Sequence, residues 1–170
     1  MHMNGGFDMI TYKKANLEDL DWLWDKKIAE NPDDSRYLRW KTQFIKDNAR
    51  GAAVTFLVVS DGESVGEGTL LLSPDCRAIR QRTCLCDGKR IANINSLRIE
   101  KEFEGLGHIS QLMKVMTQYA ASLGINLLTI GVEAAETRNL GIYLHWGFDT
   151  FIMAEEEDSV LVLYYGKKIG

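Results

Sequence analysis

The sequence predicts a single α/β domain built around a mixed sheet. Strand and helix patterns alternate in the order β-α-α-β-β-β-α-β-α-β-β, which excludes an all-helical or all-β fold. Residues 127–132 form an almost uninterrupted apolar run, typical of a central strand that is covered on both faces. The 170 residues suit one domain and can bury a sizeable core.

The N-terminal part predicts one strand followed by two helices. Residues 10–14 alternate in polarity, and Asn16 can cap a helix that continues through Ala29. Pro32 and the acidic residues beside it stop that helix. A second helix is expected from Ser35 to about Arg50.

Three strands and a polar segment are expected next. Residues 53–60 and 64–73 flank Asp61-Gly62, a turn pair typical of hairpins. Residues 74–89 are polar and rich in arginine, which indicates a loop or an extended hairpin tip. Residues 90–100 then form the next strand.

The C-terminal part predicts two helices and three strands. Residues 110–122 place apolar side chains on one helical face, and Gly124 ends that helix. The apolar strand is followed by a short helix at 136–145 and by strands at 148–153 and 159–165, which flank an acidic turn at 155–158. We expect the domain to span residues 9–168, with residues 1–8 as a short N-terminal extension.

Composition narrows the class of protein. The net charge is −4, with 45% hydrophobic and 26% charged residues, which argues against nucleic acid as the main partner. The sequence shows neither a membrane-spanning run nor a signal peptide, so we expect a cytoplasmic protein without a membrane partner. Cys76, Cys84 and Cys86 lack the paired spacing of a zinc site, which favours free thiols and no metal.

A glycine pair between a strand and a helix is the first functional motif. Gly105 and Gly107 separate the strand at 90–100 from the helix that follows, so several backbone N–H groups are free at a helix N-terminus. Three interpretations are open: a site for an anionic cofactor, a dinucleotide fingerprint, or a plain connecting turn. The fingerprint is disfavoured because hairpins, rather than βαβ units, precede it.

A second motif lies about 35 residues further on. A short helix ends in Tyr143-x-x-x-Gly147-Phe148 and is followed by strands. With the glycine turn and the apolar strand, this element resembles the GNAT (GCN5-related N-acetyltransferase) superfamily over nearly the whole chain. The resemblance implies a mostly antiparallel central sheet with helices on both faces, and an N-acetyltransferase that uses acetyl-CoA.

The resemblance also implies where coenzyme A binds. The glycine turn would hold the pyrophosphate through backbone N–H groups and the Ser110 hydroxyl, and the pantetheine arm would pair with the strand before it. Three residues depart from the family pattern: Glu104 replaces Arg or Gln, Ile109 replaces Gly or Ala, and Glu136 replaces Asn. The expected cofactor-binding residues are Leu97, Arg98, Ile99, Glu104, Gly105, Leu106, Gly107, His108, Ile109, Ser110, Glu136, Asn139 and Tyr143.

The same resemblance assigns catalytic roles. Tyr143 matches the acid that protonates the departing thiolate, since a phenol of pKa ~10 has a comparable basicity. Asn95 stands where many relatives carry Glu, and it can position a water molecule but cannot remove a proton itself. Asp25 and Glu67 are alternatives for the base.

The acceptor is expected to be a small or peptidyl primary amine carrying positive charge. Glu30 and Asp33 between the first two helices, and Glu156 in the last hairpin, would form two acidic rims around one cleft. Trp24 would add an aromatic wall for cation–π contact. Further candidates for that wall are Trp22, Trp40 and Tyr37. An equally good interpretation is that these charged turns are simply solvated and do not steer an acceptor.

Two further hypotheses stay open. The departures at Glu104 and Ile109, with the missing strand Glu, also fit a non-catalytic acyl-CoA-binding or sensing module. A homodimer is possible in which the closing strands pair across a two-fold axis.

Overall fold

In the described part of the chain, a seven-stranded sheet has the order β1-β2-β3-β4-β5-β7-β6. All neighbouring strands are antiparallel except β4 and β5, which are parallel. The structure is a computed structural model and describes residues 9–170; the expected extension at 1–8 lies outside the described residues. In chain order the strands are β1 (Ile10–Lys14), β2 (Ala53–Ser60), β3 (Glu63–Leu71), β4 (Ile91–Ile99), β5 (Leu127–Glu133), β6 (Thr150–Glu157) and β7 (Val160–Lys168).

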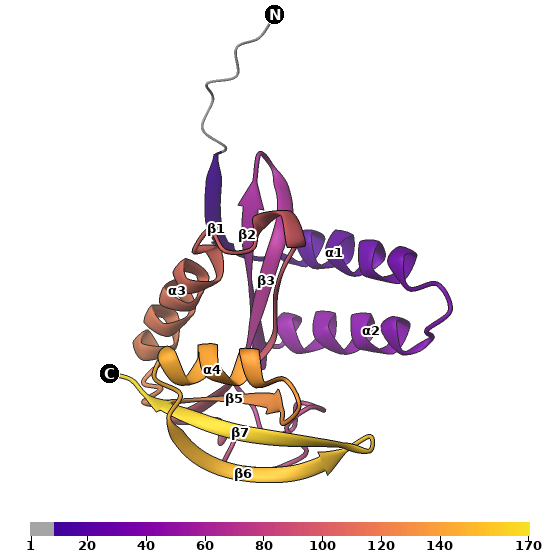
Figure 1. The fold of residues 1–170 in the computed structure, drawn as a ribbon. Helices are drawn as coiled ribbons and strands as arrows, with labels where there is room; N and C mark the ends of the chain where they lie inside the picture. Colours follow the sequence, from indigo (N-terminus) through magenta and orange to yellow (C-terminus); the bar gives the residue numbers. More distant parts are fainter. Residues whose placement is uncertain (1–8) are drawn as a thin grey trace, which may run out of the picture.

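Within residues 9–170, four α-helices cover this sheet. Together with the strand pairing, they confirm the predicted mixed, mostly antiparallel fold. They are α1 (Leu17–Glu30), α2 (Arg36–Ala49), α3 (His108–Ser122) and α4 (Thr137–His145), with a short 3₁₀ turn, η1 (Lys101–Phe103), between β4 and α3. Figure 1 shows α1 and α2 together on one side of the sheet and α3 on the other, with α4 lying across β5.

The helices begin close to where their caps predict. Asn16 accepts from the Asp19 backbone N–H at 2.8 Å, and Asp19 accepts in return from the Asn16 N–H at 2.9 Å, which completes a capping box for α1. The second helix begins at Arg36 rather than Ser35, whose side chain makes no capping bond. Asp34 instead accepts from the Arg36 backbone N–H at 3.1 Å.

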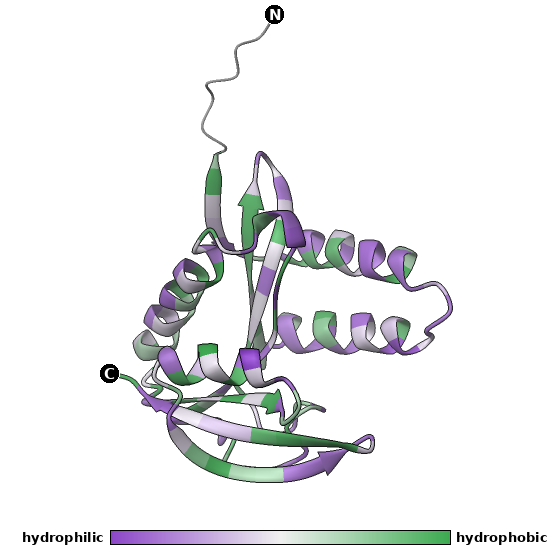
Figure 2. Ribbon diagram, viewed as in Figure 1, coloured by the Kyte–Doolittle hydropathy of each residue, from purple (hydrophilic) through white to green (hydrophobic). Residues whose placement is uncertain are grey.

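The core lies on both faces of the sheet. On the α3 face, the fully buried side chains of Met116, Leu112 and Phe148 pack with β2, β4 and β5. On the α1–α2 face, Leu20 and Leu23 of α1 pack on Leu57 of β2. Figure 2 shows hydrophobic and hydrophilic residues alternating along the helices, as expected where one helical face rests on a sheet.

The expected acidic turn at 155–158 is wrong. Glu155 and Glu157 belong to β6, and the turn is Asp158-Ser159, whose φ values of 50° and 67° match the two-residue turns that suit a hairpin. The acidic residues tolerate a strand because arginine side chains pair with them. Arg82, in the connection between β3 and β4, donates to Glu155 at 2.6 Å.

The pairing proposed for a homodimer does not fit this sheet. β7, the closing strand, is hydrogen-bonded to β5 on one edge and to β6 on the other. The free edge at this end belongs to β6, so dimerisation through a sheet edge would use β6. The homodimer itself stays a prediction, which light scattering on a size-exclusion column tests.

Candidate active site

The candidate site lies where the two parallel strands separate. β4 and β5 pair only over residues 91–94 and 127–130, although β4 continues to Ile99 and β5 to Glu133. β7 pairs with the other edge of β5 over residues 127–133, so beyond residue 130 β5 no longer pairs with β4. A wedge therefore opens between β4 and β5, with backbone from both strands along its sides.

A β-bulge in β4 accounts for the separation. The register between β3 and β4 shifts between Glu67 and Thr69, so Ser96 and Leu97 both lie opposite Gly68. Ser96 has a φ of 54°, in the left-handed region that L-residues adopt only under local constraint. A bulge bends its strand and increases the twist, so β4 turns away from β5 just beyond Asn95.

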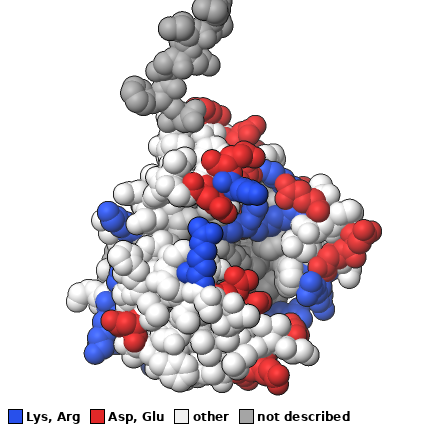
Figure 3. Space-filling view, in the orientation of Figure 1, with Lys and Arg blue, Asp and Glu red and all other residues white. Residues whose placement is uncertain are grey.

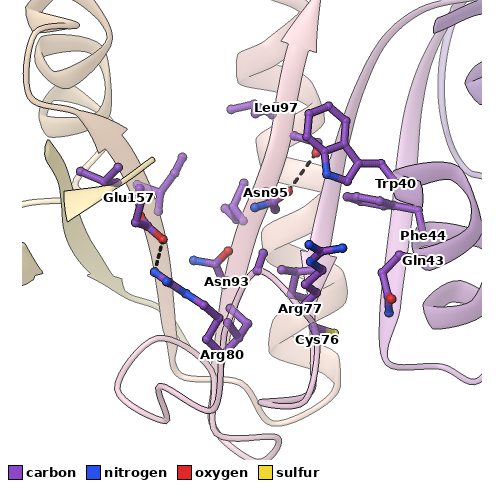
Figure 4. A pocket seen from close by; sticks show the side chains of 18 of the residues that line it. Trp40, Gln43, Phe44, Cys76, Arg77, Arg80, Asn93, Asn95, Leu97 and Glu157 are labelled. Carbon is purple, nitrogen blue, oxygen red and sulfur yellow. Dashed lines mark hydrogen bonds and ion pairs between the residues drawn. The ribbon is translucent and has the colours of Figure 1, made fainter. Parts of the chain in front are cut away.

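A cavity of about 830 Å³ lies beside this wedge. Its walls come from α1 and α2, the connection between β3 and β4, the wedge itself, α4 and the β6–β7 hairpin. In Figure 4, Asn93 and Asn95 point into it from β4, Trp40 and Phe44 from α2, and Arg77 from the β3–β4 connection. Figure 3 shows charged side chains of both signs around a hollow between α2 and α4. This volume suits a small molecule or the end of a peptide.

Two asparagines are fixed on the strand that faces the cavity. Asn93 is only 3% exposed, and its amide nitrogen donates to Thr129 Oγ1 at 3.0 Å. Asn95 Oδ1 accepts from Ser96 Oγ at 2.9 Å. The bonded oxygen of Asn95 leaves its amide nitrogen as a donor toward the cavity, where it can orient a water molecule or a substrate.

Tyr143 reaches the same cavity from α4. Burial raises the pKa of its phenol, and the negative charge of Glu136 raises this pKa further. The hydroxyl therefore stays protonated at neutral pH and is available as a proton donor. Tyr143 and Asn95, the two side chains to which the family resemblance assigns catalysis, thus line the same cavity.

The Tyr-x-x-x-Gly-Phe element holds Tyr143 in place. Gly147 has a φ of 96° and ends the helix, and the Phe148 N–H donates to the Tyr143 carbonyl at 3.0 Å. Phe148 is fully buried, and its ring lies edge-on to Tyr143 with centroids 6.5 Å apart. The Tyr143 ring also lies at a tilt beside Trp146, with centroids 6.0 Å apart. The motif anchors one aromatic residue in the core so that another lines the cavity.

The glycine turn presents free donors at the start of α3. Gly105 and Gly107 have φ values of 75° and 82°, and Gly107 is the N-cap of the helix. Within residues 9–170, no hydrogen bond uses the backbone N–H groups of residues 105–110, and the first bonded one is Gln111, to the Gly107 carbonyl at 3.1 Å. A Cβ added at either glycine would meet nothing within 4 Å, so the turn has open space in front of it. Free donors, open space and the helix dipole together make an anion cradle.

The side chains around this cradle lie in different environments. The His108 ring turns toward β1, where its Nδ1 lies 2.9 Å from the Tyr12 hydroxyl. Ile109 packs against the core beneath α3, whereas Glu104 and Leu106 are exposed. The departure from the family pattern at Ile109 is therefore accommodated by burial, and the Glu104 carboxylate lies in solvent beside the turn.

The remaining expected cofactor contacts lie along the wedge and at the start of α4. Leu97 and Ile99 pack toward α3, and Arg98 is exposed on the opposite face of β4. Asn139 donates to Glu136 Oε2 at 3.3 Å at the N-terminus of α4, with both side chains exposed.

The expected acceptor residues do not all face one cleft. Trp24 and Glu156 line the cavity, and Trp24 stacks at a tilt on Phe44, with ring centroids 5.1 Å apart. Glu30 and Asp33 line a separate shallow depression at the α1–α2 connection. Of the two acidic rims, the structure places the β6–β7 hairpin at the cavity and the α1–α2 connection outside it.

The alternatives for the base lie elsewhere. Asp25 is exposed and pairs with Lys41 at 2.6 Å. Glu67 is buried beneath α1, where it pairs with Lys27. Neither residue lines the cavity. A carboxylate that does is Glu133, at the end of β5.

The cysteines are free thiols, and one of them lies at the cavity wall. Burial raises the pKa of Cys76 to about 11, and its Sγ donates to the Ala52 carbonyl at 3.4 Å. A protonated, buried thiol is a poor nucleophile. Among residues 9–170, no group of His, Cys, Asp and Glu side chains is arranged to hold a metal, and no helix is long and apolar enough to cross a membrane.

Comparison with known proteins identifies the family. Residues 17–148 match the Acetyltransferase (GNAT) family. The chain belongs to the GNAT acetyltransferase family. This match favours the acetyltransferase interpretation of the glycine turn over the dinucleotide one. No curated protein matches the sequence significantly.

Solved GNAT-like structures share the fold at low sequence identity. A GNAT acetyltransferase from Streptococcus pneumoniae superimposes with a TM-score of 0.68 and 17% identity, over 95% of this chain and 100% of that one. Ribosomal-protein-alanine N-acetyltransferase from Brucella melitensis gives 0.68 and 14%, over 94% and 99%. The yncA protein from Salmonella typhimurium, solved with its cofactor acetyl-CoA, gives 0.66 and 10%, over 95% and 94%.

Several cavity residues are not predicted from the sequence. Asn93 lies two residues before Asn95, and the alternation of a strand could have placed both on one face. Arg77 belongs to a polar segment that was expected to be a loop, without a defined position. Gln43 lies on α2, and no local pattern shows that it lines a cavity rather than the core. Trp40, a sequence candidate for the aromatic wall, does line this cavity.

Proposed function

We propose that this GNAT acetyltransferase moves the acetyl group of acetyl-CoA to a primary amine by direct attack. The observation that carries the proposal is that Tyr143 and Asn95, from α4 and β4, line one cavity beside the wedge between β4 and β5. A proton donor and a polar positioning group then face the same reacting atoms.

The residues around the wedge fit coenzyme A. The free N–H groups of residues 106–110 and the Ser110 hydroxyl would hold the pyrophosphate. The edge of β4 that leaves β5 would pair with the pantetheine arm near Leu97 and Ile99. When bound, acetyl-CoA supplies an acetyl thioester, whose carbon–sulfur bond breaks as the carbon–nitrogen bond of the amide forms.

Tyr143 supplies the proton that the leaving sulfur needs. Its Oη–H, kept protonated by burial, passes its proton to the thiolate sulfur, and the phenol is restored from solvent. Backbone N–H groups at the bulge, at Leu97 or Arg98, would stabilise the negative charge on the acetyl oxygen. An ammonium group and the thioester thus become an amide and a thiol, with one proton released.

Asn95 positions the water molecule that carries the amine proton away. Its amide cannot take a proton, but its free N–H donors can orient a water molecule against the attacking nitrogen. A covalent route through Cys76 is disfavoured because that thiol is buried, protonated and bonded to the Ala52 carbonyl.

The acceptor enters as a small or peptidyl ammonium group. Glu133, Glu156 and Asp158 line the cavity and have no ion-pair partner within the described part of the chain, so they favour a cation. The rings of Trp40 and Trp24 add aromatic wall. The similar Brucella structure is named a ribosomal-protein-alanine N-acetyltransferase, which supports a peptidyl acceptor.

A panel of amines tests this function. Thiol release is followed with acetyl-CoA and polyamines, amino acids, aminoglycosides and peptide N-termini, and calorimetry measures acetyl-CoA binding. We expect binding together with thiol release on at least one amine class. Binding of acetyl-CoA without release on any amine would contradict the enzyme proposal.

A non-catalytic acyl-CoA sensor is the second candidate. The observations that favour it are the exposed carboxylate of Glu104 beside the cradle and an amide, Asn95, at the strand position where a base is usual. The same calorimetry and release assays separate the two functions. A sensor binds acetyl-CoA and releases no thiol.

A further inference from the structure

The connection between β3 and β4, residues 72–90, closes one end of the cavity. It is not a mobile hairpin tip, because its Ile79, Leu85 and Cys86 side chains are almost fully buried and form a small core with Leu71 and Tyr164. We call it the β3–β4 cap. The cap places Arg77 at the cavity wall.

Bonds to three other elements fix the cap in place. Thr129 Oγ1 of β5 donates to the Leu85 carbonyl at 2.7 Å. Arg82 donates to Glu155 of β6 at 2.6 Å, and Asp75 pairs with Arg50 after α2 at 2.7 Å. A segment held at three points can present one side chain in a defined direction.

Arg77 is exposed and carries a positive charge with no ion-pair partner among residues 9–170. Figure 4 shows its guanidinium directed into the cavity between Asn93 and Gln43. Within residues 9–170, Arg77 makes neither an ion pair nor a side-chain hydrogen bond, whereas Arg80 pairs with Glu157 at 2.6 Å and Arg36 with Asp34 at 2.7 Å.

Asp47, the acidic residue on the same side of the cavity as Arg77, already has hydrogen-bond partners. Asp47 Oδ1 accepts from Arg50 at 2.9 Å, and its Oδ2 accepts from Gln43 Nε2 at 3.0 Å. Arg39 of α2 lines this side as well and has no ion-pair partner in the described chain. The unpaired acids, Glu133, Glu156 and Asp158, come from the β5 end and the β6–β7 hairpin. The cavity therefore carries opposite charges on different walls.

We propose that Arg77 binds a carboxylate of the acceptor, so that the acceptor is an amino acid rather than a simple amine. A guanidinium offers two parallel N–H donors that match a carboxylate, and Arg39 adds positive charge. The ammonium group of the same molecule then faces Tyr143, Asn95 and the acidic hairpin. This inference rests on the proposed function and specifies its substrate.

Matched acceptors test the contact with Arg77. Thiol release is measured with amino acids and with the corresponding amino amides, which differ only in the carboxylate. The wild-type protein is compared with Arg77→Met, which removes the charge, and Arg77→Lys, which keeps the charge and loses the paired donors. Arg90→Met, at the end of the cap and outside the cavity, is the matched control.

We expect the wild-type kcat/KM to favour the acid over the amide, and Arg77→Met to reduce that preference roughly 10- to 100-fold. Arg77→Lys should retain part of it, and Arg90→Met all of it. A wild-type preference for amides, or a preference that Arg77→Met leaves unchanged, would overturn the inference.

Binding of products separates this inference from the proposed function. Calorimetry measures the affinity for an N-acetylated amino acid and for its amide, and so tests the contact between Arg77 and the carboxylate without turnover. Thermal unfolding checks that the variants fold. No thiol release from any acceptor contradicts the proposed function, yet Arg77-dependent binding of the acid would still support the carboxylate site. Equal binding of acid and amide would contradict that site even if amines are acetylated.

Discussion

The proposed cofactor side of the site and its acceptor side are built in opposite ways. The cofactor side consists of backbone N–H groups from one short stretch, residues 105–110, placed by two glycines and a helix N-terminus. The acceptor side consists of side chains from α1, α2, the β3–β4 cap, the end of β5 and the β6–β7 hairpin. Backbone donors tolerate sequence change, so departures such as Ile109 need not abolish binding, whereas single substitutions should alter the acceptor side.

The largest expected effect is that of Tyr143→Phe. Removing the phenol should lower kcat roughly 100- to 10,000-fold, since a general acid contributes about that much, while acetyl-CoA binding stays nearly unchanged. Because burial and Glu136 raise the pKa of Tyr143, its deprotonation should lower wild-type activity only above about pH 10. Steady-state kcat is measured against pH with a saturating acceptor.

Tyr165→Phe is the matched control for this prediction. Tyr165 lies on β7, packs against Phe151 with centroids 5.6 Å apart, and does not line the cavity. Its loss should leave kcat within a few-fold of wild type. A Tyr143→Phe protein with wild-type kcat at every pH would remove Tyr143 from the mechanism.

Gly107→Ala tests the backbone side. The φ of 82° is strained for alanine by about 1–2 kcal/mol, and relief of that strain would move the free N–H groups. We expect the affinity for coenzyme A to fall about tenfold, measured by calorimetry. Gly124→Ala is the matched control, because Gly124 has a φ of 84° and equally open surroundings at the other end of α3. Equal affinity losses in both variants would mean that helix stability, not the cradle, controls binding.

The same contrast explains which parts of the site could be predicted from the sequence. The strand, glycine turn and helix that form the cradle are consecutive, so local periodicity and turn chemistry define them. Tyr143 could be proposed from the sequence because Gly147 and Phe148 follow it at four and five residues, a spacing that carries the family resemblance. Element order and most boundaries follow from such local signals.

The acceptor side depends on contacts between residues distant in the sequence. The polar composition of residues 74–89 predicted a loop without a defined position. Cys76, Ile79 and Leu85 of this segment are buried against β3 and β7. Their burial fixes Arg77 at the cavity. The acidic run at 155–158 was expected to be a turn because its charges suggested exposure. Arg82, from the cap, stabilises Glu155 in a strand instead, and no local pattern predicts that pairing.

Glu156→Lys tests the acidic wall of the acceptor side. Glu156 is exposed at the β6–β7 hairpin, so it acts on an approaching ammonium group through solvent. We expect kcat/KM for a cationic acceptor to fall several-fold at low salt and by less at 0.5 M salt, since screening removes long-range attraction. Glu63→Lys, at the start of β3 and outside the cavity, controls for the change in net charge. A loss that does not depend on salt would point to a direct contact rather than steering.

Glu104→Gln probes the one side chain expected to oppose the backbone cradle. Its exposed carboxylate lies one residue before the glycine turn, and removing the negative charge should tighten coenzyme A binding roughly two- to fivefold at low salt, with little effect at high salt. Glu63→Gln, at the start of β3 and outside the glycine turn, should leave the affinity unchanged. Calorimetry over a series of salt concentrations measures both variants. Weaker binding in Glu104→Gln would mean that this carboxylate supports the turn instead of repelling the phosphates, and the cradle would then depend on a side chain as the acceptor side does.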